Sequence, residues 1–281
     1  MSVPRISVVI PTRHRNDLLA LCLDRLAPGV QTLPAEQYEV IVTDDGSTST
    51  AEAMIREKYP WAKWTQGPRK GPAANRNHGA SLASGEWIAF TDDDCLPSPG
   101  WLAAYVATIV SGVAVYEGRT ICSEGVRSPM MHSPTNDDGG WLWSCNMMVS
   151  REYFRRWKFD EGFPYAHMED THYRERLKAN GDRFAFAGDA IVDHPPRPIL
   201  PGYRAARHGE CEVIFDYKMH RQPRSMLGYL WRRGKFRAQV ILRMPWGIDT
   251  IRALWHLGIE LCCVIPHYRQ WLRKYRPLAA T

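Results

Sequence analysis

The sequence lacks a glycine-rich loop where many nucleotide-binding folds carry one. Ile6 to Ile10 is an apolar segment typical of a buried strand, and residues 11–15, which follow it, contain no glycine. A dinucleotide-binding fold places G-x-G-x-x-G there, because glycine lets the backbone approach the pyrophosphate. This absence argues against a dinucleotide-dependent oxidoreductase.

Paired cysteine motifs are also missing. The seven cysteines are scattered, none forms a C-x-x-C pair, and only Cys262 and Cys263 are adjacent. This pattern argues against a disulfide framework and against a zinc site, and it fits a reducing compartment. The N-terminus leads directly into the first strand without the apolar segment of a signal peptide. We therefore expect a cytoplasmic protein.

No apolar run is long enough to span a bilayer. The most apolar stretch, residues 250–265, is short, and Arg252, His256 and Glu260 interrupt it.

Charge is unevenly divided along the chain. Residues 195–281 carry 16 Lys+Arg against 5 Asp+Glu, which leaves 20 Lys+Arg against 25 Asp+Glu before residue 195. The C-terminal part is therefore expected to meet an anionic partner.

Residues 201–281 are predicted to form a helical, basic C-terminal extension. One interpretation is a solvated helical cap on the main domain. The other is a set of interfacial helices that bind anionic lipid headgroups, so that the protein is peripheral on the inner face of the membrane. No recognisable nucleic-acid motif accompanies these charges, and nucleic acid is not expected as a partner.

What the sequence does contain is a regular alternation of strands and helices. Segments of strand type lie near residues 6–10, 38–43, 62–65 and 87–90, and helical segments near 16–26, 50–58, 71–84 and 98–109. Asn16 and Ser98 are expected as N-caps, with Pro99 as the first residue of its helix. The alternation predicts an α/β fold with a parallel sheet and helices on both faces.

Residues 111–200 are less regular. Strands are expected at 113–121, 141–149, 183–186 and 190–194, and helices at 151–157 and from Glu169 to a C-terminal Gly181. Residues 122–140, rich in Pro, Ser, Gly and Asp, are predicted to form a mobile loop over the cleft. We therefore expect one domain of residues 1–200, in two halves that divide near residue 110, followed by the region 201–281.

Acidic residues follow two of the predicted strands. Asp92, Asp93 and Asp94 come after the strand at 87–90, and Asp44 and Asp45 after the strand at 38–43. We expect these two strands to lie side by side, so that both clusters meet in one cleft at the carboxyl end of the sheet. Three adjacent carboxylates repel one another unless a cation compensates them, and Mg²⁺ and Mn²⁺ prefer such oxygens. The alternative is a set of acidic turn residues in water.

Asp44, Asp45 and Arg76 each have a structural and a functional interpretation. The two carboxylates precede a Gly-Ser turn, but one of them would also suit the N–H of a nucleobase. Arg76 lies near the start of a helix, where a cation opposes the helix dipole. A nearby diphosphate or Asp would explain that placement.

Glu169, Asp170 and His194 leave two interpretations open as well. Acids in a first helical turn are favourable charge–dipole placements, and either carboxylate would also suit a general base. His194 ends a strand before two prolines, and it is either a buried histidine or a neutral nitrogen ligand.

Taken together, these segments resemble the family 2 glycosyltransferases of the GT-A fold. The resemblance covers about residues 5–195 and rests on motifs in order: Val-Val-Ile-Pro-Thr (8–12), Asp-Asp-Gly-Ser (44–47), Ala-Asn-Arg-Asn (74–77), Phe-Thr-Asp-Asp-Asp (90–94), Met-Glu-Asp (168–170) with Arg-Leu-Lys-Ala-Asn-Gly (176–181), and Val-Asp-His (192–194). It implies a Rossmann-like, mostly parallel sheet with a nucleotide-binding half (about 1–110) and an acceptor half (about 111–200). Residues beyond about 201 match no pattern that we assign.

The resemblance also implies a binding site for a nucleoside-diphosphate sugar with Mg²⁺ or Mn²⁺. The residues that would lie beside the nucleoside, its base and the phosphates are Pro11, Thr12, Arg13, either Asp44 or Asp45, and Arg76. Asp92 and Asp94 would form an Asp-X-Asp motif, with Asp92 or Asp93 nearer the ribose or sugar. Asp94 and the later His194 would contact the metal, with Asp92 as a further candidate. Because three Asp stand in a row, the register of the ligands is open.

The implied reaction is a single displacement with inversion at the anomeric carbon. Asp170, with Glu169 beside it, would take the proton of an acceptor hydroxyl on a glycan or a lipid-linked glycan. The metal would offset the charge on the leaving diphosphate. Trp141 and Trp143 would suit a sugar ring, or are core residues. The alternatives are a non-catalytic nucleotide- or glycan-binding scaffold and a sugar nucleotidyltransferase, which ordinarily needs a glycine-rich phosphate loop.

Overall fold

The computed structural model describes residues 5–280, with side chains as far as residue 278. The chain forms two compact units, which are described separately below. The first unit runs to Ser123 and resumes at Pro134–Pro195, and the second comprises Glu124–Ser133 and the chain from Pro196 onward. The domain boundary expected at residue 200 stays a prediction, but residues 124–133 were not expected to group with the C-terminal region.

The first unit is built on one eight-stranded sheet with the order β3-β2-β1-β4-β8-β6-β9-β5. Its strands are β1 Ile6–Thr12, β2 Tyr38–Asp44, β3 Ala62–Gln66, β4 Trp87–Thr91, β5 Leu96–Pro97, β6 Val115–Ile121, β8 Asn146–Ser150 and β9 Phe184–Asp193. The first four are mutually parallel, β8 is antiparallel to both of its neighbours, and β6 and β9 are parallel. The prediction of a mostly parallel sheet is confirmed, and the exceptions are β8 and the two-residue β5, which is antiparallel to β9.

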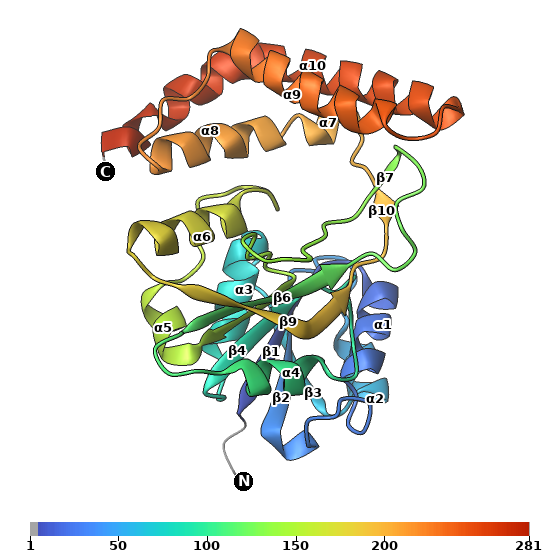
Figure 1. Ribbon diagram of the computed structural model, residues 1–281, viewed down its shortest axis with the longest axis vertical. Coiled ribbons are helices and arrows are strands. Elements are labelled where there is room, and N and C mark those ends of the chain that lie inside the picture. Colours follow the sequence, from blue (N-terminus) through green and yellow to red (C-terminus); the bar gives the residue numbers. More distant parts are fainter. Residues whose placement is uncertain (1–4, 281) are drawn as a thin grey trace. The chain divides into compact units, whose positions relative to one another are not determined.

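Helices cover both faces of this sheet (Figure 1). One face packs against α1 Asn16–Leu26, α2 Glu52–Lys58 and α4 Trp101–Thr108, and the other against α3 Pro72–Ser81, α5 Arg151–Arg156 and α6 Glu169–Ala179. In β1, Val8 and Ile10 belong to the first core and Val9 to the second. Because successive side chains of a strand point to opposite faces, a continuous apolar run is needed where both faces are buried.

Two helix starts differ from the predictions. Arg15 occupies the N-cap position of α1, and the Asn16 side chain instead donates a hydrogen bond to the Thr50 carbonyl. The helix α4 begins at Trp101, because the Ser98 carbonyl accepts a hydrogen bond from the Trp101 N–H in a turn. Helix starts depend on local hydrogen bonds that the hydrophobic pattern does not specify.

The later part of the unit also departs from the expected pattern. The strand expected at 141–149 covers only Asn146–Ser150, and two short strands expected at 183–194 form the single ten-residue β9. Gly181 ends α6 with φ +78°, as expected for a C′ glycine. The loop expected at 122–140 contains the strand β7 Met131–His132, and Asn136 pairs with Thr120 through two backbone hydrogen bonds. That segment is therefore more ordered than predicted.

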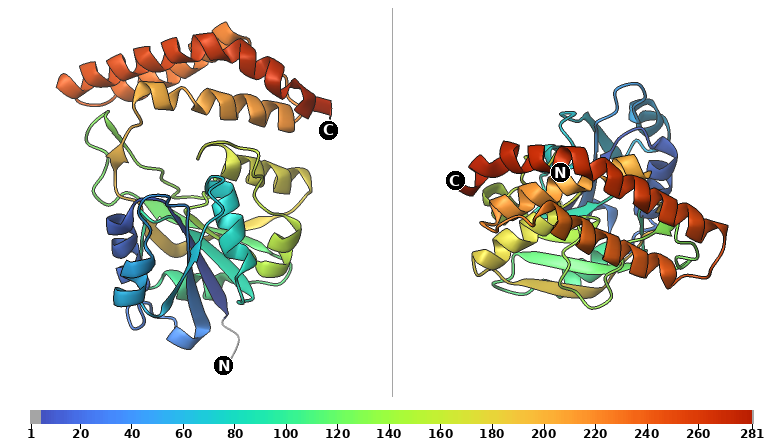
Figure 2. Two further views of the ribbon diagram at one scale, coloured as in Figure 1. Left: turned by 180° about the vertical axis from the view of Figure 1, so that it is seen from behind. Right: turned by 90° about the horizontal axis from the view of Figure 1, so that it is seen from above.

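The second unit is helical, as the sequence predicts. It consists of the antiparallel pair β7 and β10 Arg197–Pro198 and the helices α7 Gly202–Ala205, α8 His208–Lys218, α9 Met226–Leu242 and α10 Ile248–Tyr275, with the short η2 Arg276–Ala280. Its core contains Val213, Tyr229, Val264, Tyr268 and Trp271. Figure 2 shows α9 and α10 running side by side. Within the described part of the chain, no helix combines the length and apolar character needed to cross a membrane.

Candidate active site

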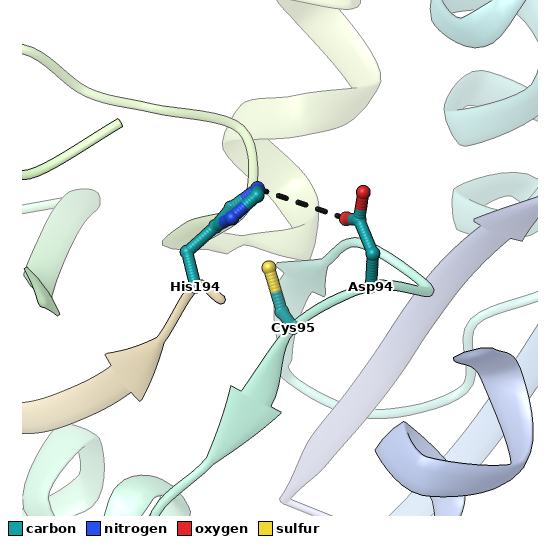
Figure 3. A group of neighbouring side chains, drawn as sticks. All are labelled: Asp94, Cys95 and His194. Atoms are coloured by element: carbon teal, nitrogen blue, oxygen red, sulfur yellow. Dashed lines mark ion pairs between the residues drawn. The ribbon is translucent and has the colours of Figure 1, made fainter. Parts of the chain in front are cut away.

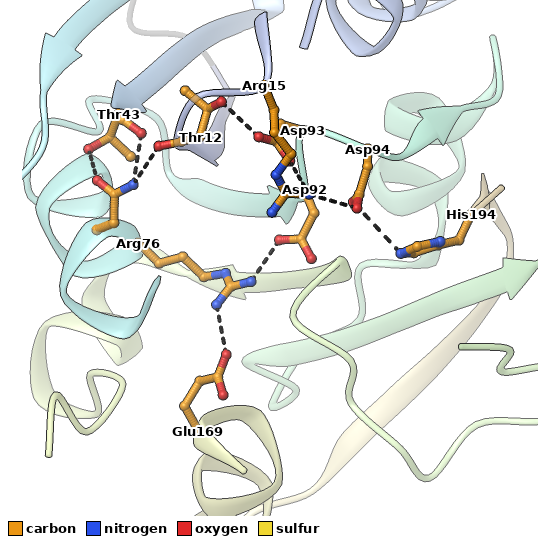
Figure 4. A network of polar contacts seen from close by, with 10 residues as sticks. Thr12, Arg15, Thr43, Arg76, Asp92, Asp93, Asp94, Glu169 and His194 are labelled. Carbon is orange, nitrogen blue, oxygen red and sulfur yellow. Dashed lines mark hydrogen bonds and ion pairs between the residues drawn. The ribbon is translucent and has the colours of Figure 1, made fainter. Parts of the chain in front are cut away.

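The candidate site lies at the carboxyl end of the first four strands, which is where open α/β sheets bind ligands. The two strands that end in acids were predicted to be neighbours. This prediction is wrong, because β1 lies between β2 and β4. Thr12 at the end of β1 bridges them instead. Its hydroxyl donates to Asp93 (2.7 Å), and its carbonyl accepts from the Asn75 amide (3.4 Å), which also contacts Thr43 (Figure 4).

The three adjacent acids have three different environments. Asp92 forms an ion pair with Arg76 at 2.7 Å. Asp93 is buried beneath Arg15 at 3.1 Å, and burial raises the pKa of its carboxyl to about 7 although Arg15 opposes the shift. Asp94 contacts Arg15 at 2.8 Å and faces His194. The repulsion expected within the triplet is thus relieved by two arginines.

Asp94 and His194 form a donor pair that fits a divalent cation. His194 is fully buried, and its Nε2 lies 3.7 Å from Oδ1 of Asp94 (Figure 3). Its Nδ1 lies 3.1 Å from the Pro195 carbonyl. If Nδ1 donates its proton there, Nε2 presents a lone pair toward the carboxylate, as a ligating imidazole must. The two interpretations of His194, a buried histidine and a ligand, are therefore compatible with each other.

Cys95 completes a cluster whose donor atoms all lie within 4.8 Å of one another. Burial raises the pKa of its thiol well above the ordinary range. A neutral thiol is a poor ligand, and hard cations prefer oxygen and nitrogen donors. The donor set that remains, one carboxylate and one imidazole, fits Mn²⁺ or Mg²⁺.

The two acids at the end of β2 differ from each other. Both oxygens of Asp44 are engaged, because they accept hydrogen bonds from the N–H groups of Gly46 and Ala51 at 2.7 Å each. Asp44 therefore orders the turn, which is its structural interpretation. Asp45 is also buried, accepts the Arg69 N–H at 2.8 Å, and has its pKa raised by burial.

Arg76 connects the acid triplet to helix α6. Its guanidinium is almost fully buried and contacts Asp92 on one side and Glu169 on the other, the latter at 3.2 Å. Burial alone would lower the pKa of Arg76. The attraction of the two acids outweighs burial and raises the pKa above its ordinary value, so the guanidinium stays charged. Of the two explanations offered for Arg76, the structure supplies the carboxylate partner.

Glu169 and Asp170 have different environments. Glu169 is buried, and its burial and the neighbouring Asp170 raise its pKa while Arg76 opposes the shift. Asp170 is half-buried in the first turn of α6, which begins after Met168 in the left-handed region at φ +75°. This left-handed residue lies at the N-cap of α6, directly before the two acids.

Residues 7–169 match the protein family described as Glycosyl transferase family 2. The chain belongs to glycosyl transferase family 2. It shares 29% identity over 216 residues with Glycosyltransferase AglE of Haloferax volcanii, covering 70% of this chain and 69% of that protein. With Validoxylamine A glucosyltransferase of Streptomyces hygroscopicus subsp. limoneus it shares 40% over 112 residues, or 37% of this chain and 24% of that protein.

A third relative is the GalNAc(5)-diNAcBac-PP-undecaprenol beta-1,3-glucosyltransferase of Campylobacter jejuni, 32% identical over 100 residues, 33% of this chain and 30% of that protein. Solved structures show the same fold. The mannosyltransferase PcManGT from Pyrobaculum calidifontis in complex with GDP-Man and Mn²⁺ has a TM-score of 0.57 at 20% identity, covering 100% of this chain and 87% of that one. TarS 1–349 of S. aureus in complex with UDP has a TM-score of 0.54 at 18% identity, covering 95% and 91%. The expected family, enzyme class and GT-A fold are thereby confirmed.

Sequence reasoning missed three residues of this family 2 glycosyltransferase. Arg15 was assigned to a polar loop, yet it contacts two members of the acid triplet. Glu117 is buried and accepts hydrogen bonds from the N–H groups of residues 140–142. Arg174, four residues after Asp170, donates to the carbonyls of Gly140 and Trp141. Two signals in the sequence could have identified some of them: the basic residues of the loop after β1 for Arg15, and an acid inside a strand for Glu117.

Glu117 and Arg174 hold the backbone of Trp141, whose ring stacks on that of Trp143. Trp141 and Trp143 are stacked with their rings 8° from parallel and their centroids 5.3 Å apart. Trp141 is 47% exposed, whereas the ring of Trp143 is half-buried. Of the other predicted residues, Pro11 is buried in β1 and Arg13 is exposed just after it. The roles of all these residues stay predictions.

Proposed function

We propose that this glycosyltransferase moves a sugar, with inversion, from a nucleoside-diphosphate sugar to an acceptor hydroxyl in a metal-dependent reaction. The observation that carries the proposal is the Asp94–His194 pair, which offers hard-cation donors at the same sheet edge as Arg76 and the start of α6. Likeness to a fold neighbour in complex with GDP-Man and Mn²⁺ supports it.

Asp94 and His194 are the residues that would hold the cation, and Asp92 has the weaker claim because it does not belong to the donor cluster around His194. When bound, the cation offsets negative charge on the leaving diphosphate. A mixed oxygen and nitrogen donor set favours Mn²⁺ over Mg²⁺, which prefers oxygen ligands.

Donor recognition is assigned to the loops after β1 and β2. Asp45 is the better candidate for the base, since both oxygens of Asp44 are engaged in its own turn. Pro11, Thr12 and Arg13 would lie beside the nucleoside. Asp92 and Asp93, held by Arg76 and Arg15, would lie nearer the ribose or the sugar.

Asp170 is assigned the general base. It would take the proton of the acceptor hydroxyl while the oxygen forms a bond to the anomeric carbon and the bond to the diphosphate oxygen breaks. Glu169 would position it, because the ion pair with Arg76 anchors the first turn of α6. One base on the face opposite the leaving group gives inversion.

The acceptor is proposed to be a glycan or a lipid-linked glycan. The Campylobacter relative is named for an undecaprenol-linked acceptor. The exposed ring of Trp141 is an apolar face of the kind on which a sugar stacks, and Arg174 attaches its backbone to the helix that carries Asp170. The seven free cysteines accord with a cytoplasmic location.

A thermal-shift screen of UDP, GDP, dTDP and CMP with their sugar conjugates, each with and without Mn²⁺, tests the proposal. A ligand that binds only the native state raises the melting temperature. We expect a metal-dependent shift with one nucleoside diphosphate, lost in Asp94→Ala, followed by turnover of its sugar conjugate. Binding without turnover would favour a non-catalytic scaffold, and the absence of any shift would contradict donor binding.

A further inference from the structure

Helix α10 presents an apolar strip to solvent along its first five turns. The residues on this strip follow one another at a spacing of three or four: Ile248, Ile251, Trp255, Gly258, Cys262 and Pro266. Ile248, Ile251 and Trp255 are 62%, 64% and 70% exposed. A spacing of three and four residues places side chains on one face of a helix. The exposed apolar side chains are therefore gathered on one face of the helix and not scattered.

The opposite side of α10 already provides the packing that the fold needs. Ala253, Leu257, Val264 and Tyr268 are buried in the cores of the second unit, against α8 and α9. The helix is thus apolar on both sides over this stretch. Because a surface helix normally has a polar outer face, the exposed strip serves something other than folding.

Further apolar side chains are exposed in α9 and in the turn before α10. Trp246, in the turn between α9 and α10, is 75% exposed, and Leu242 at the end of α9 is 47% exposed. Trp231 on α9 is 72% exposed. Of the nineteen large hydrophobic side chains that are exposed in the described part of the chain, eleven lie between Leu227 and Ile265.

Cations lie at both ends of the strip. Arg243 and Arg252 are exposed at its beginning, and Arg269 and Arg273 at its end. The two acids of α10 are already paired, Asp249 with Arg252 and the buried Glu260 with Arg233. Arginines that flank an apolar strip with tryptophans complement a surface that is anionic at the headgroups and apolar beneath.

We propose that the apolar strip of α10, together with Trp246 just before the helix, binds the surface of a membrane that contains anionic lipids. The helix would lie in the interface with its tryptophans at the headgroup boundary, since it is not apolar enough to span. A second copy of the chain is a poorer occupant, because pairing two strips in either direction would bring arginines against arginines. This inference goes beyond the catalytic proposal and does not depend on it.

Vesicle flotation with the full-length protein tests the inference. The vesicles contain phosphatidylcholine alone or with roughly one third phosphatidylglycerol, at low and high salt. The test variant is the double substitution Ile251→Glu and Trp255→Glu. The matched control is Leu18→Glu with Leu21→Glu, two exposed apolar residues on α1 outside the site. Thermal melting confirms that both variants are folded.

We expect the unaltered protein to bind the anionic vesicles, and we expect this binding to weaken as salt is added. The control variant should bind equally well, and the binding of the test variant should fall by more than about tenfold. Asp94→Ala should bind vesicles normally, and the test variant should bind nucleotide normally, so that this inference and the catalytic proposal fail separately. Equal binding by the test variant, or no binding by the unaltered protein, would overturn the inference. The inference would also be overturned if the unaltered protein bound no vesicles but formed a dimer, and if the test variant were monomeric.

Discussion

Arg76 and Glu169, which are 93 positions apart in the sequence, form a buried ion pair at 3.2 Å. The pair attaches the first turn of α6 to α3, and Asp92 holds the other side of the same guanidinium at 2.7 Å. One cation thus compensates an acid from the proposed donor side and an acid from the proposed acceptor side. We therefore expect that both the stability of the fold and the geometry of the proposed site depend on Arg76.

Replacing Arg76 with Met should destabilise the protein by about 3–5 kcal/mol, because it leaves two poorly solvated carboxylates without their partner. Urea unfolding measures the change. Adding Glu169→Gln to this variant should recover part of the stability but not the transfer activity, since the anchor between α3 and α6 is still missing. A single variant as stable as the unaltered protein would show that Arg76 does not compensate these acids.

Replacing Asp170 with Asn should leave the binding of donor and metal intact and lower transfer by roughly 10²–10⁴-fold, because the amide cannot accept the acceptor's proton. Calorimetric titration and single-turnover transfer separate the two effects. Glu152→Gln, which alters an exposed acid on α5, is the control and should transfer normally. Undiminished turnover in Asp170→Asn would exclude Asp170 as the base.

Replacing Trp141 with Ala should raise the KM for a soluble acceptor by roughly three- to tenfold through the loss of ring stacking. The KM for the donor should not change. Leu82→Ala, which removes another exposed apolar side chain, serves as the control. If the KM for the donor rises instead, the stacked tryptophans contact the donor side of the site.

Glu39 is expected to make the stability of the fold depend on pH. Although burial alone would raise its pKa, hydrogen bonds from Lys63, Ser7 and Ser84 lower it from 4.5 to about 2. A lowered carboxyl pKa gives stability that is fully present above about pH 4.5 and is lost as the pH falls toward 2.

Glu39→Gln should therefore cost about 1–2 kcal/mol at pH 7, after allowance for solvent screening, and much less near pH 2. Urea unfolding at several pH values follows both proteins. Glu57→Gln, on the exposed side of α2, is the control and should change little. A loss of stability that is the same at every pH would mean that charge on Glu39 does not matter.

The first half of the fold was predictable because its signals are local. Three of the first four strands, β1, β2 and β4, are short and largely apolar, and polar residues follow them. The crossover helices between the strands make a parallel arrangement nearly obligatory. The place of β8 was not predictable in this way. Asn146, at its start, is buried and accepts hydrogen bonds from Trp101 and Tyr105 while donating to two backbone carbonyls. Such a polar contact in the core depends on strand order, which the pattern of apolar residues does not specify.

The candidate site was predictable as a set of residues but not as a set of pairings. The acids were visible in the sequence because carboxylates at strand ends are unusual. Which acid meets which arginine depends on contacts across the sheet, such as Arg15 with Asp93 and Asp94. The error about neighbouring strands had the same origin, because β1 was not expected between β2 and β4.

The pairing of β7 with β10 has a practical consequence for anyone who shortens this protein. His132 and Met131 pair with Arg197 and Pro198, and Met130 accepts a hydrogen bond from Ile199. A stop codon placed after residue 195 would delete one strand and leave its partner as an open edge that invites aggregation. A shortened protein without the helices should therefore also carry a short linker in place of residues 124–133. Insolubility of the simpler truncation would report an orphaned strand and nothing about what the helices do.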